Sequence, residues 1–281
     1  MKKNIFFICL FIVSIWTNIF SQTNENRVMT YNIRYQNENP GEEWSIRKEL
    51  VAEMIRFNKP DIFGVQEALK SQIDYLEESL PEFLWTGKGR DDGNMAGEYS
   101  AIFFSKKYLM LDTETFWLSP TPEIPSKAWD AALPRIVTMI KITDKTTKDT
   151  IVVLNTHFDH IGKIARENSA EIIVKKCQEI TQKYPIILMG DFNVTDTSKV
   201  YSILNGSYFN NAQNISKFIN YGSNDTFNGF KDDFTPKEKI DFIFVNDKVK
   251  VLHHAVIGDK FNNRFASDHM PVIVDFAIKR K

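Results

Sequence analysis

The amino-acid sequence predicts an α/β protein in which mixed or antiparallel β-sheets are covered by helices. The predicted strands outnumber the predicted helices, and several strands follow one another directly, whereas a parallel sheet would alternate strands with helices. Polar side chains stand repeatedly where a strand ends or begins, which is where layered α/β proteins collect their ligands. The 281 residues contain no linker rich in Pro, Gly or Ser, so we expect a single domain over residues 22–281.

The N-terminus has the pattern of a signal peptide. Lys2 and Lys3 supply positive charge, Ile5–Ile15 is almost wholly apolar, and Ser21 is a small residue at a plausible cleavage point. The apolar run is too short for a stable membrane span, and its flanking residues are too weak to anchor one. An uncleaved anchor is the alternative to a signal peptide. We therefore expect residues 1–21 to direct export to the periplasm or the medium, and we expect no membrane span in the mature chain.

Composition limits the binding partners. The full chain has a net charge of −1, and removal of residues 1–21 takes away Lys2 and Lys3 and leaves −3. A mildly acidic protein lacks the broad basic surface of a general nucleic-acid binder, although a local basic patch stays open. Cys177 is the one cysteine of the mature chain, so the sequence predicts no internal disulfide and too few ligands for a structural zinc site.

The first part of the chain alternates strands with helices. Apolar runs typical of buried strands are Val28–Ile33 and Ile62–Val65, and helical spacing of apolar residues covers 45–58 and Ala68–Ser79. Glu67 stands directly after the second strand. It is either a functional carboxylate or a first-turn glutamate favoured by the dipole of the following helix.

The middle of the chain is rich in predicted strands. They are expected at Ala101–Phe104, Ile136–Ile142 and Ile151–Asn155, before a long helix over Ile161–Lys183. Residues 116–135 form a predicted loop that contains Trp117, Trp129 and Asp130. The aromatic side chains of this loop either rim a site or pack as its core.

Polar residues follow two of the buried strands. His157, Asp159 and His160 come just after Ile151–Asn155, where a hydrogen-bonded turn is the alternative to acid–base or metal chemistry. Asp191 and Asn193 follow the strand Ile186–Met189. Their spacing points both side chains the same way in an extended chain, and an Asx turn is the alternative.

The C-terminal part begins with an irregular polar stretch up to Glu238. Strands are then predicted at Ile240–Val245, Val251–Ile257 and Val272–Ile278. Asp241 lies inside the first of these strands, where a carboxylate is costly unless it is paired. Asp268 and His269 immediately precede the last strand.

Six short motifs, taken together and in order, resemble the endonuclease/exonuclease/phosphatase superfamily. They are Thr30–Arg34, Gln66–Glu67, Asn155–His160, Gly190–Asn193, Ile240–Ile243 and Ser267–His269. The resemblance implies a four-layer sandwich with two facing mixed β-sheets flanked by helices. It also implies hydrolysis of a phosphate ester that depends on a divalent metal ion.

The resemblance implies a metal site with few protein ligands. Glu67 and Asp268 would be the metal carboxylates, and Asn32 would support them by hydrogen bonding. A sparse set of oxygen ligands fits Mg²⁺, with Mn²⁺ or Ca²⁺ as alternatives. Some family members carry an acid where Arg34 stands here, so a second metal ligand at that position is not expected.

The resemblance also implies roles in catalysis. Asp191 would orient or deprotonate the attacking water, with Asn193 holding that water or the phosphate. His269 would bind or protonate the phosphoryl group, and Asp241 would fix the tautomer of His269. The remaining phosphate-binding residues implied by the family are His157, Arg135 and Tyr99.

The substrate class stays open at this stage. Nucleic acid, a phosphorylated sugar and a lipid head group all fit the implied chemistry, and no stable protein partner is expected. A catalytically inactive module that binds a sugar or lipid head group is the alternative function, but such a module should have lost some site residues. A partner-activated nuclease is disfavoured because the chain has no strong basic run.

Overall fold

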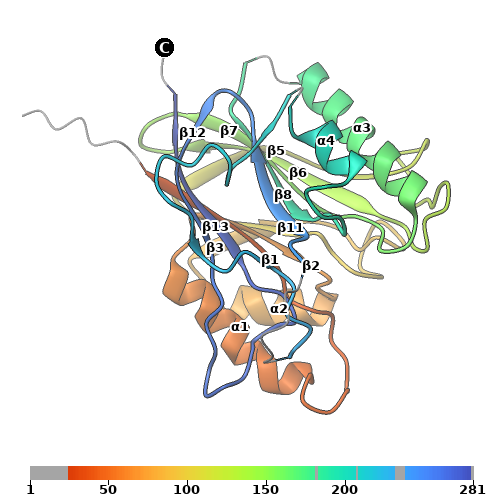
Figure 1. Cartoon of the computed structure of the whole chain (residues 1–281), viewed down its shortest axis with the longest axis vertical. Coiled ribbons are helices and arrows are strands. Elements are labelled where there is room, and N and C mark those ends of the chain that lie inside the picture. The colour runs from red at the N-terminus through yellow and green to blue at the C-terminus, as the bar shows by residue number, and fades with distance from the viewer. Residues whose placement is uncertain (1–24, 181–182, 207, 232–237, 280–281) are drawn as a thin grey trace, which may run out of the picture.

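The protein is described by a computed structural model that covers residues 25–180, 183–206, 208–231 and 238–279. Two mixed β-sheets pack face to face, and one pair of helices covers the outside of each sheet (Figure 1). This is the four-layer α/β sandwich that the motifs imply. The predicted signal peptide, residues 1–21, lies outside the described residues.

The first sheet has seven strands in the order β10-β12-β13-β1-β2-β4-β3. Its strands are β1 (Asn26–Asn32), β2 (Ile62–Gln66), β3 (Phe83–Thr86), β4 (Ile102–Ser105), β10 (Tyr221–Gly222), β12 (Val249–Val256) and β13 (Val272–Ile278). Helices α1 (Trp44–Asn58) and α2 (Lys70–Ser79) lie on its outer face. Met29 and Phe63 from the sheet and Val51 and Ile73 from the helices belong to the core cluster on that face.

The second sheet has six strands in the order β5-β6-β7-β8-β11-β9. Its strands are β5 (Tyr108–Trp117), β6 (Ile136–Asp144), β7 (Thr150–His157), β8 (Ile186–Asp191), β9 (Asn210–Asn211) and β11 (Asp241–Val245). Helices α3 (Lys163–Ile180) and α4 (Lys199–Leu204) cover its outer face, at the upper right of Figure 1. Cys177 is a buried cysteine outside any disulfide and belongs to the core beneath α3.

A third apolar cluster fills the space between the two sheets. It contains inward side chains such as Val28 and Ile62 from the first sheet and Val153 and Met189 from the second. Because side chains alternate across each strand, every central strand contributes one row to this shared core and one row beneath the helices. This double burial explains why the central strands read as continuous apolar runs in the sequence.

The structure corrects several predicted boundaries. The second helix starts at Lys70 rather than Ala68, because Ala68 forms an isolated β-bridge with Tyr99. The third helix starts at Lys163 and is described to Ile180; residues 181–182 of the predicted span lie outside the described residues. Phe116 and Trp117 belong to β5 and are buried, so the predicted loop over residues 116–135 begins too early.

Other elements were absent from the sequence prediction. β3 has only four residues, of which one is buried, and β5 has five exposed residues, so neither shows the continuous buried run of a central strand. The segment before Glu238 that was predicted to be irregular contains α4, β9 and β10, while residues 207 and 232–237 lie outside the described residues. Among the helices of the described segments, none has the length and apolar character needed to cross a membrane.

Candidate active site

Three polar side chains of the second sheet become neighbours through strand pairing. His157 ends β7 and Asp191 ends β8, and these residues are directly paired in the parallel register. Asp241 begins β11 and pairs with Asp191 across the antiparallel register. Strand ends therefore bring together residues that are far apart in the sequence.

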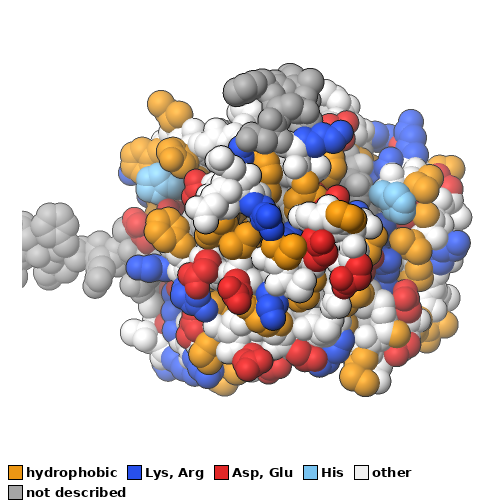
Figure 2. Space-filling model, turned by 90° about the horizontal axis from the view of Figure 1, so that it is seen from below, with side chains coloured by type: hydrophobic (Ala, Val, Ile, Leu, Met, Phe, Trp, Pro, Cys, Tyr) orange, Lys and Arg blue, Asp and Glu red, His pale blue; other side chains and the backbone are white. Residues whose placement is uncertain are grey.

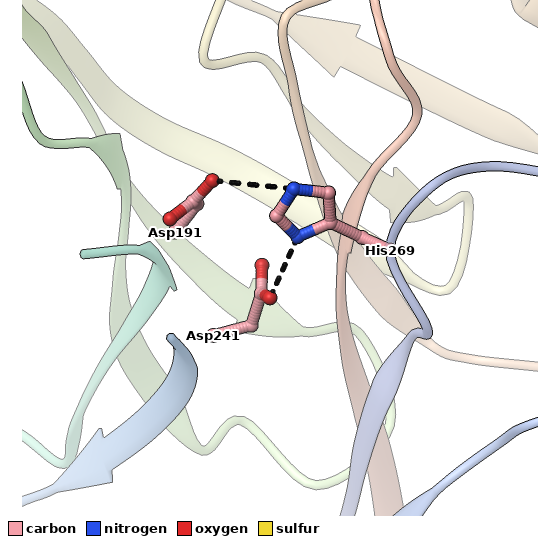
Figure 3. A group of neighbouring side chains, drawn as sticks. All are labelled: Asp191, Asp241 and His269. Carbon is pink, nitrogen blue, oxygen red and sulfur yellow. Dashed lines mark hydrogen bonds and ion pairs between the residues drawn. The ribbon is translucent and has the colours of Figure 1, made fainter. Parts of the chain in front are cut away.

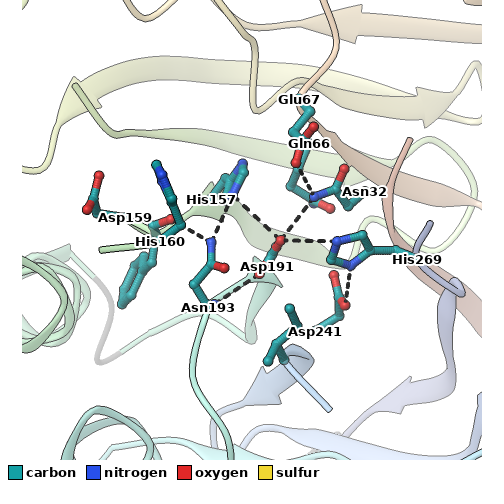
Figure 4. Close-up of polar contacts among 12 residues, drawn as sticks. Asn32, Gln66, Glu67, His157, Asp159, His160, Asp191, Asn193, Asp241 and His269 are labelled. Atoms are coloured by element: carbon teal, nitrogen blue, oxygen red, sulfur yellow. Dashed lines mark hydrogen bonds and ion pairs between the residues drawn. The ribbon is translucent and has the colours of Figure 1, made fainter. Parts of the chain in front are cut away.

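The first sheet supplies the other half of the site. Asn32 ends β1 and pairs with Gln66 at the end of β2, so Glu67 follows immediately beside it. Asp268 and His269 lie in the segment just before β13. Figure 4 shows Asn32 and His269 from this half of the site facing Asp191, with Glu67 next to Asn32.

Asp191 is the centre of the hydrogen-bond network. Its Oδ2 accepts from Nδ2 of Asn32 at 3.0 Å, and its Oδ1 accepts from the backbone N–H of Asn193 at 2.9 Å. Nε2 of His157 and Nε2 of His269 lie 3.6 and 3.8 Å from Oδ2. Burial, with a further contribution from Asp241, raises the pKa of Asp191 to about 7. Asp191 can therefore take up or release a proton near neutral pH.

His269 and Asp241 form a tight buried pair. Nδ1 of His269 lies 2.8 Å from Oδ2 of Asp241 (Figure 3). Burial alone would lower the pKa of His269, but the Asp241 and Asp191 carboxylates outweigh it and raise the pKa to about 10. This geometry holds His269 as an imidazolium whose other nitrogen faces Asp191.

Asp191, Asp241 and His269 are also close enough to hold a metal ion, since one ligand atom from each lies within 4.8 Å of the others. In the structure, however, His269 Nδ1 is engaged by Asp241, and both oxygens of Asp191 accept hydrogen bonds. Hydrogen bonds therefore occupy most of the possible ligand atoms in this group. Oδ1 of Asp241 is buried without a hydrogen-bond partner among the described residues.

His157 has the opposite electrostatics from His269. Burial, followed by the charge of Arg135, lowers the pKa of His157 well below its usual value. Nε2 of His157 lies 3.0 Å from Nδ2 of Asn193, and Asn193 also donates to the carbonyl of Phe158. The amide N–H₂ is a donor only, so Nε2 is the acceptor and the proton of the neutral ring is on Nδ1.

A second group of carboxylates lies beside Asn32. Nδ2 of Asn32 donates to Oε1 of Glu67 at 3.0 Å, and Oδ1 of Asn32 accepts from the backbone N–H of Arg34 at 3.0 Å. Burial raises the pKa of Asp268, and the charge of Glu67 raises it further. The Arg34 guanidinium lies 3.7 Å from Glu67 and 3.6 Å from Asp268.

These residues fit a hard divalent cation. Glu67 and Asp268 supply oxygen ligands, their mutual repulsion would be relieved by a cation, and the pocket leaves room for water ligands. Asn32 offers its N–H₂ group to Glu67 rather than its oxygen to a metal. Support of the metal carboxylates by Asn32 through hydrogen bonding stays a prediction.

Arg135 is placed to bind an anion. It is only 5% exposed, and its Nη2 lies 3.0 Å from Nδ1 of His160. Its Nε lies 3.4 Å from Asp159, while Nη1 is buried without a hydrogen-bond partner among the described residues. A buried guanidinium with an unused N–H group is costly unless a ligand completes it.

Tyr99 lines a small cavity together with Arg135 and His157, which also line the main pocket, so its role in binding phosphate stays a prediction. Tyr99 itself is buried, it does not line the main pocket, and its hydroxyl donates to the carbonyl of Asn94. Arg166, at the start of α3, donates to the carbonyl of Asp159 and so supports the turn instead of facing the pocket.

Sequence reasoning missed Glu98. Its carboxylate makes a bidentate pair with Arg90, at 2.6 and 3.0 Å, and its Oε2 lies 4.0 Å from Nδ1 of His157. Neither residue follows a buried strand, so the pattern that indicated the other site residues could not find them. His160 lines the pocket as well. Of the two histidines in the motif Asn155–His160, only His157 was assigned a role from the sequence.

An open pocket of about 540 Å³ is lined by ten of the residues described above, whereas Asn32 and Asp241 are not in its lining. The ten are Arg34, Glu67, Glu98, Arg135, His157, His160, Asp191, Asn193, Asp268 and His269. Besides the residues already described, its walls include Tyr35, Glu42, Leu133, Phe227, Gly229, Phe230, Glu238 and Ile240. The volume is typical of a site for a small molecule. Acidic side chains outnumber the two arginines, Arg34 and Arg135, in this lining.

Comparison with known proteins gives the family. The model of the Endonuclease/Exonuclease/phosphatase family matches residues 29–269, and the chain belongs to this family. Its members are phosphoester hydrolases that generally use divalent metal ions. The protein L388 of Acanthamoeba polyphaga mimivirus is 26% identical over 249 residues, which is 83% of this chain and 92% of the viral protein.

Solved structures agree with this assignment. A family member from Bacteroides thetaiotaomicron is 35% identical with a TM-score of 0.88, and the match covers 92% of this chain and all of that one. A mannosyl-6-phosphatase from the same species is 36% identical with a TM-score of 0.86, over 90% of this chain and 100% of the other. The human Nocturnin catalytic domain shares the fold, with 21% identity and a TM-score of 0.72. That match covers 91% of this chain and 94% of the Nocturnin domain.

Proposed function

We propose that this protein hydrolyses a phosphate ester by attack of water on phosphorus, with the help of a divalent metal ion. One observation carries the proposal: Asn32 joins Asp191, a carboxylate that titrates near neutrality, to Glu67 in the candidate metal site. A general base and a cation site are thereby held next to each other at a fixed distance. Both are needed for attack on a phosphate ester at neutral pH.

Each residue then has a defined task. Asp191 orients the attacking water and accepts its proton, and Asn193 holds Asp191 through its backbone N–H. His269, charged because of Asp241, donates to the phosphoryl oxygen on which negative charge builds up. A divalent ion on Glu67 and Asp268 would neutralise charge on the phosphate and leaving oxygens.

Arg135 completes the phosphate-binding side, and His157 supports it by positioning Asn193. The unused Nη1 of Arg135 points to a charge-assisted hydrogen bond with a non-bridging oxygen. His157 is neutral and protonated on Nδ1, so its Nε2 is engaged by Asn193. It acts by holding Asn193 in place, with contact to the substrate left to Arg135.

We propose a phosphate monoester of a small polar alcohol, such as a sugar, as the substrate class. Glu42, Glu98 and Glu238 line the pocket in addition to the carboxylates assigned to chemistry. These acids would repel a nucleic-acid strand with its many phosphates, but they can accept hydrogen bonds from sugar hydroxyls. On the face seen in Figure 2, Lys and Arg side chains are interspersed with Asp and Glu side chains. The 36% identical mannosyl-6-phosphatase supports the same class.

Hydrolysis of p-nitrophenyl phosphate and of bis(p-nitrophenyl) phosphate tests the proposal. Each ester is assayed with Mg²⁺, Mn²⁺, Ca²⁺ or EDTA, followed by a panel of hexose phosphates and a single-stranded oligonucleotide. We expect metal-dependent release that EDTA abolishes, with the monoester preferred. Asp191→Ala and His269→Ala should remove turnover while circular dichroism shows an intact fold. Preference for the diester or the oligonucleotide would overturn the substrate class, and unchanged turnover in either variant would overturn the residue roles.

A further inference from the structure

Arg34 occupies an unusual position between two carboxylates. Its Nη1 lies 3.7 Å from Oε2 of Glu67, and its Nε lies 3.6 Å from Oδ2 of Asp268. Neither distance is short enough for a hydrogen bond, although an arginine fork normally approaches a carboxylate to below 3 Å. The guanidinium therefore balances the charge of the pair without bonding closely to either member.

The hydrogen bonding of Arg34 is incomplete. Its Nε is buried and has no hydrogen-bond partner among the described residues. The side chain is 28% exposed and lines the main pocket, and its guanidinium carbon lies 4.7 Å from the centre of the Tyr35 ring. It is thus held loosely, with open space beside it.

The backbone of Arg34 is held firmly, in contrast to its side chain. Its φ angle is +56°, in the left-handed region that few residues other than glycine adopt. Its N–H donates to Asn32, and its carbonyl accepts from Gln72 at 3.0 Å and from Arg47 at 3.3 Å. The strained turn therefore delivers the side chain to one place, next to the carboxylates.

We propose that Arg34 is a tethered cation that balances Glu67 and Asp268 in the metal-free protein and competes with the divalent ion for that position. The inference rests on the proposed function, which assigns these two carboxylates to the metal. Two carboxylates in a partly desolvated corner repel each other, and a cation between them relieves that repulsion. A divalent ion would supply twice the charge and would displace the guanidinium, whose half-buried side chain can move further into the pocket that it lines.

Mn²⁺ titration of the full-length protein without substrate tests this competition. Isothermal calorimetry gives the dissociation constant for the wild type, Arg34→Gln and Arg34→Met. Removal of the competing charge should tighten Mn²⁺ binding about tenfold, and the difference should shrink at high salt. Arg56→Gln, which removes an exposed arginine of α1, is the matched control for net charge and should stay within about twofold of wild type.

Thermal unfolding provides a second readout that a merely structural arginine would not produce. In EDTA, Arg34→Gln should melt about 2–4 °C below wild type, because the repulsion between the carboxylates is no longer balanced. With saturating Mn²⁺ the difference should close or reverse, since the tighter-binding variant gains more from the ligand. A variant that is destabilised equally under both conditions would overturn the proposal.

Glu67→Gln separates this inference from the proposed function. It should weaken Mn²⁺ binding strongly in the wild-type background. If it does, and Arg34→Gln binds Mn²⁺ no more tightly than wild type, only the role of Arg34 is overturned. If Glu67→Gln binds Mn²⁺ as well as wild type does, the position of the metal is wrong and both proposals fail together.

Discussion

At the scale of single residues, Asp241 determines the charge and orientation of His269. Its Oδ2 lies 2.8 Å from Nδ1 of His269, and both side chains are buried. Asp241→Asn keeps the shape of the side chain but removes the negative charge that holds the imidazole protonated. We expect kcat to fall about 10²- to 10⁴-fold with little change in KM, because the imidazolium stabilises charge that develops only in the transition state.

Steady-state kinetics with p-nitrophenyl phosphate measure this loss. Asp247→Asn, which neutralises the exposed aspartate two residues beyond the end of β11, is the matched control and should behave as the wild type. Asp241 also shows what single residues reveal without a structure. A carboxylate inside an apolar strand is costly unless paired, and that argument alone predicted a partner for it.

His254 should make stability depend on pH. Burial, with a contribution from Lys239, lowers the pKa of His254 to about 3, whereas an unfolded chain binds the proton near its ordinary value. The folded state is therefore favoured above about pH 6.5, and this contribution is lost as the pH falls toward about 3. Between about pH 7.5 and about pH 5, the loss from this one group amounts to about 2 kcal/mol.

Urea unfolding at the two pH values tests this effect. His254→Gln cannot be protonated, so its stability should decrease less on acidification than that of the wild type, by about that amount. His253→Gln, at the more exposed neighbouring position in β12, is the control. Equal losses for the wild type and His254→Gln would show that another group carries the dependence.

At the scale of elements, the sequence predicts what is buried on both faces and misses what is not. β8 and β11 are entirely buried, so their residues form recognisable apolar runs. β5 pairs with β6 along its length, but most of its first eight residues are exposed or half-buried at the sheet edge. Its identity as a strand therefore depends on a partner strand, which a local pattern cannot show.

The loop before β6 is held in place by contacts that no local sequence pattern shows. Asp130 accepts from the backbone N–H groups of Ile164 and Ala165 at the start of α3. Asp159 accepts from Ala132 and Leu133 on the loop. These contacts join segments about thirty residues apart. The sequence therefore indicates that Asp130 and Asp159 are suited to accept hydrogen bonds in turns, but it does not identify their donors. These contacts fix the loop that delivers Arg135 to the pocket.

At the scale of the whole molecule, the site exists only because two sheets meet at one edge. Asn32 and Glu67 come from the first sheet, whereas His157, Asp191 and Asp241 come from the second. The motifs predicted this set of residues in order along the chain. Their distances depend on the spacing between the sheets, which side chains between them determine and which no motif contains.

Gly64 is a point where that spacing is set. It lies in β2, and a methyl group added to it would meet Cγ of Asn155 at 2.6 Å and Cε of Met189 at 2.7 Å on the opposite sheet. Asn155 cannot easily move, because its Nδ2 donates to the carbonyls of Val65 and Ala101 at 2.9 Å. Gly64→Ala must therefore push the sheets apart or break these hydrogen bonds.

We expect Gly64→Ala to lower the free energy of unfolding by about 1–3 kcal/mol and to reduce kcat as well, although Gly64 does not line the pocket. The activity falls because Asp191 and Glu67, on different sheets, lose their common hydrogen-bond link through Asn32. Gly258→Ala is the matched control, since its nearest neighbour is the flexible side chain of Met270 at 3.3 Å. A variant that is destabilised but fully active at low temperature would show that the site tolerates movement between the sheets, and that each half of the site is positioned by its own sheet alone.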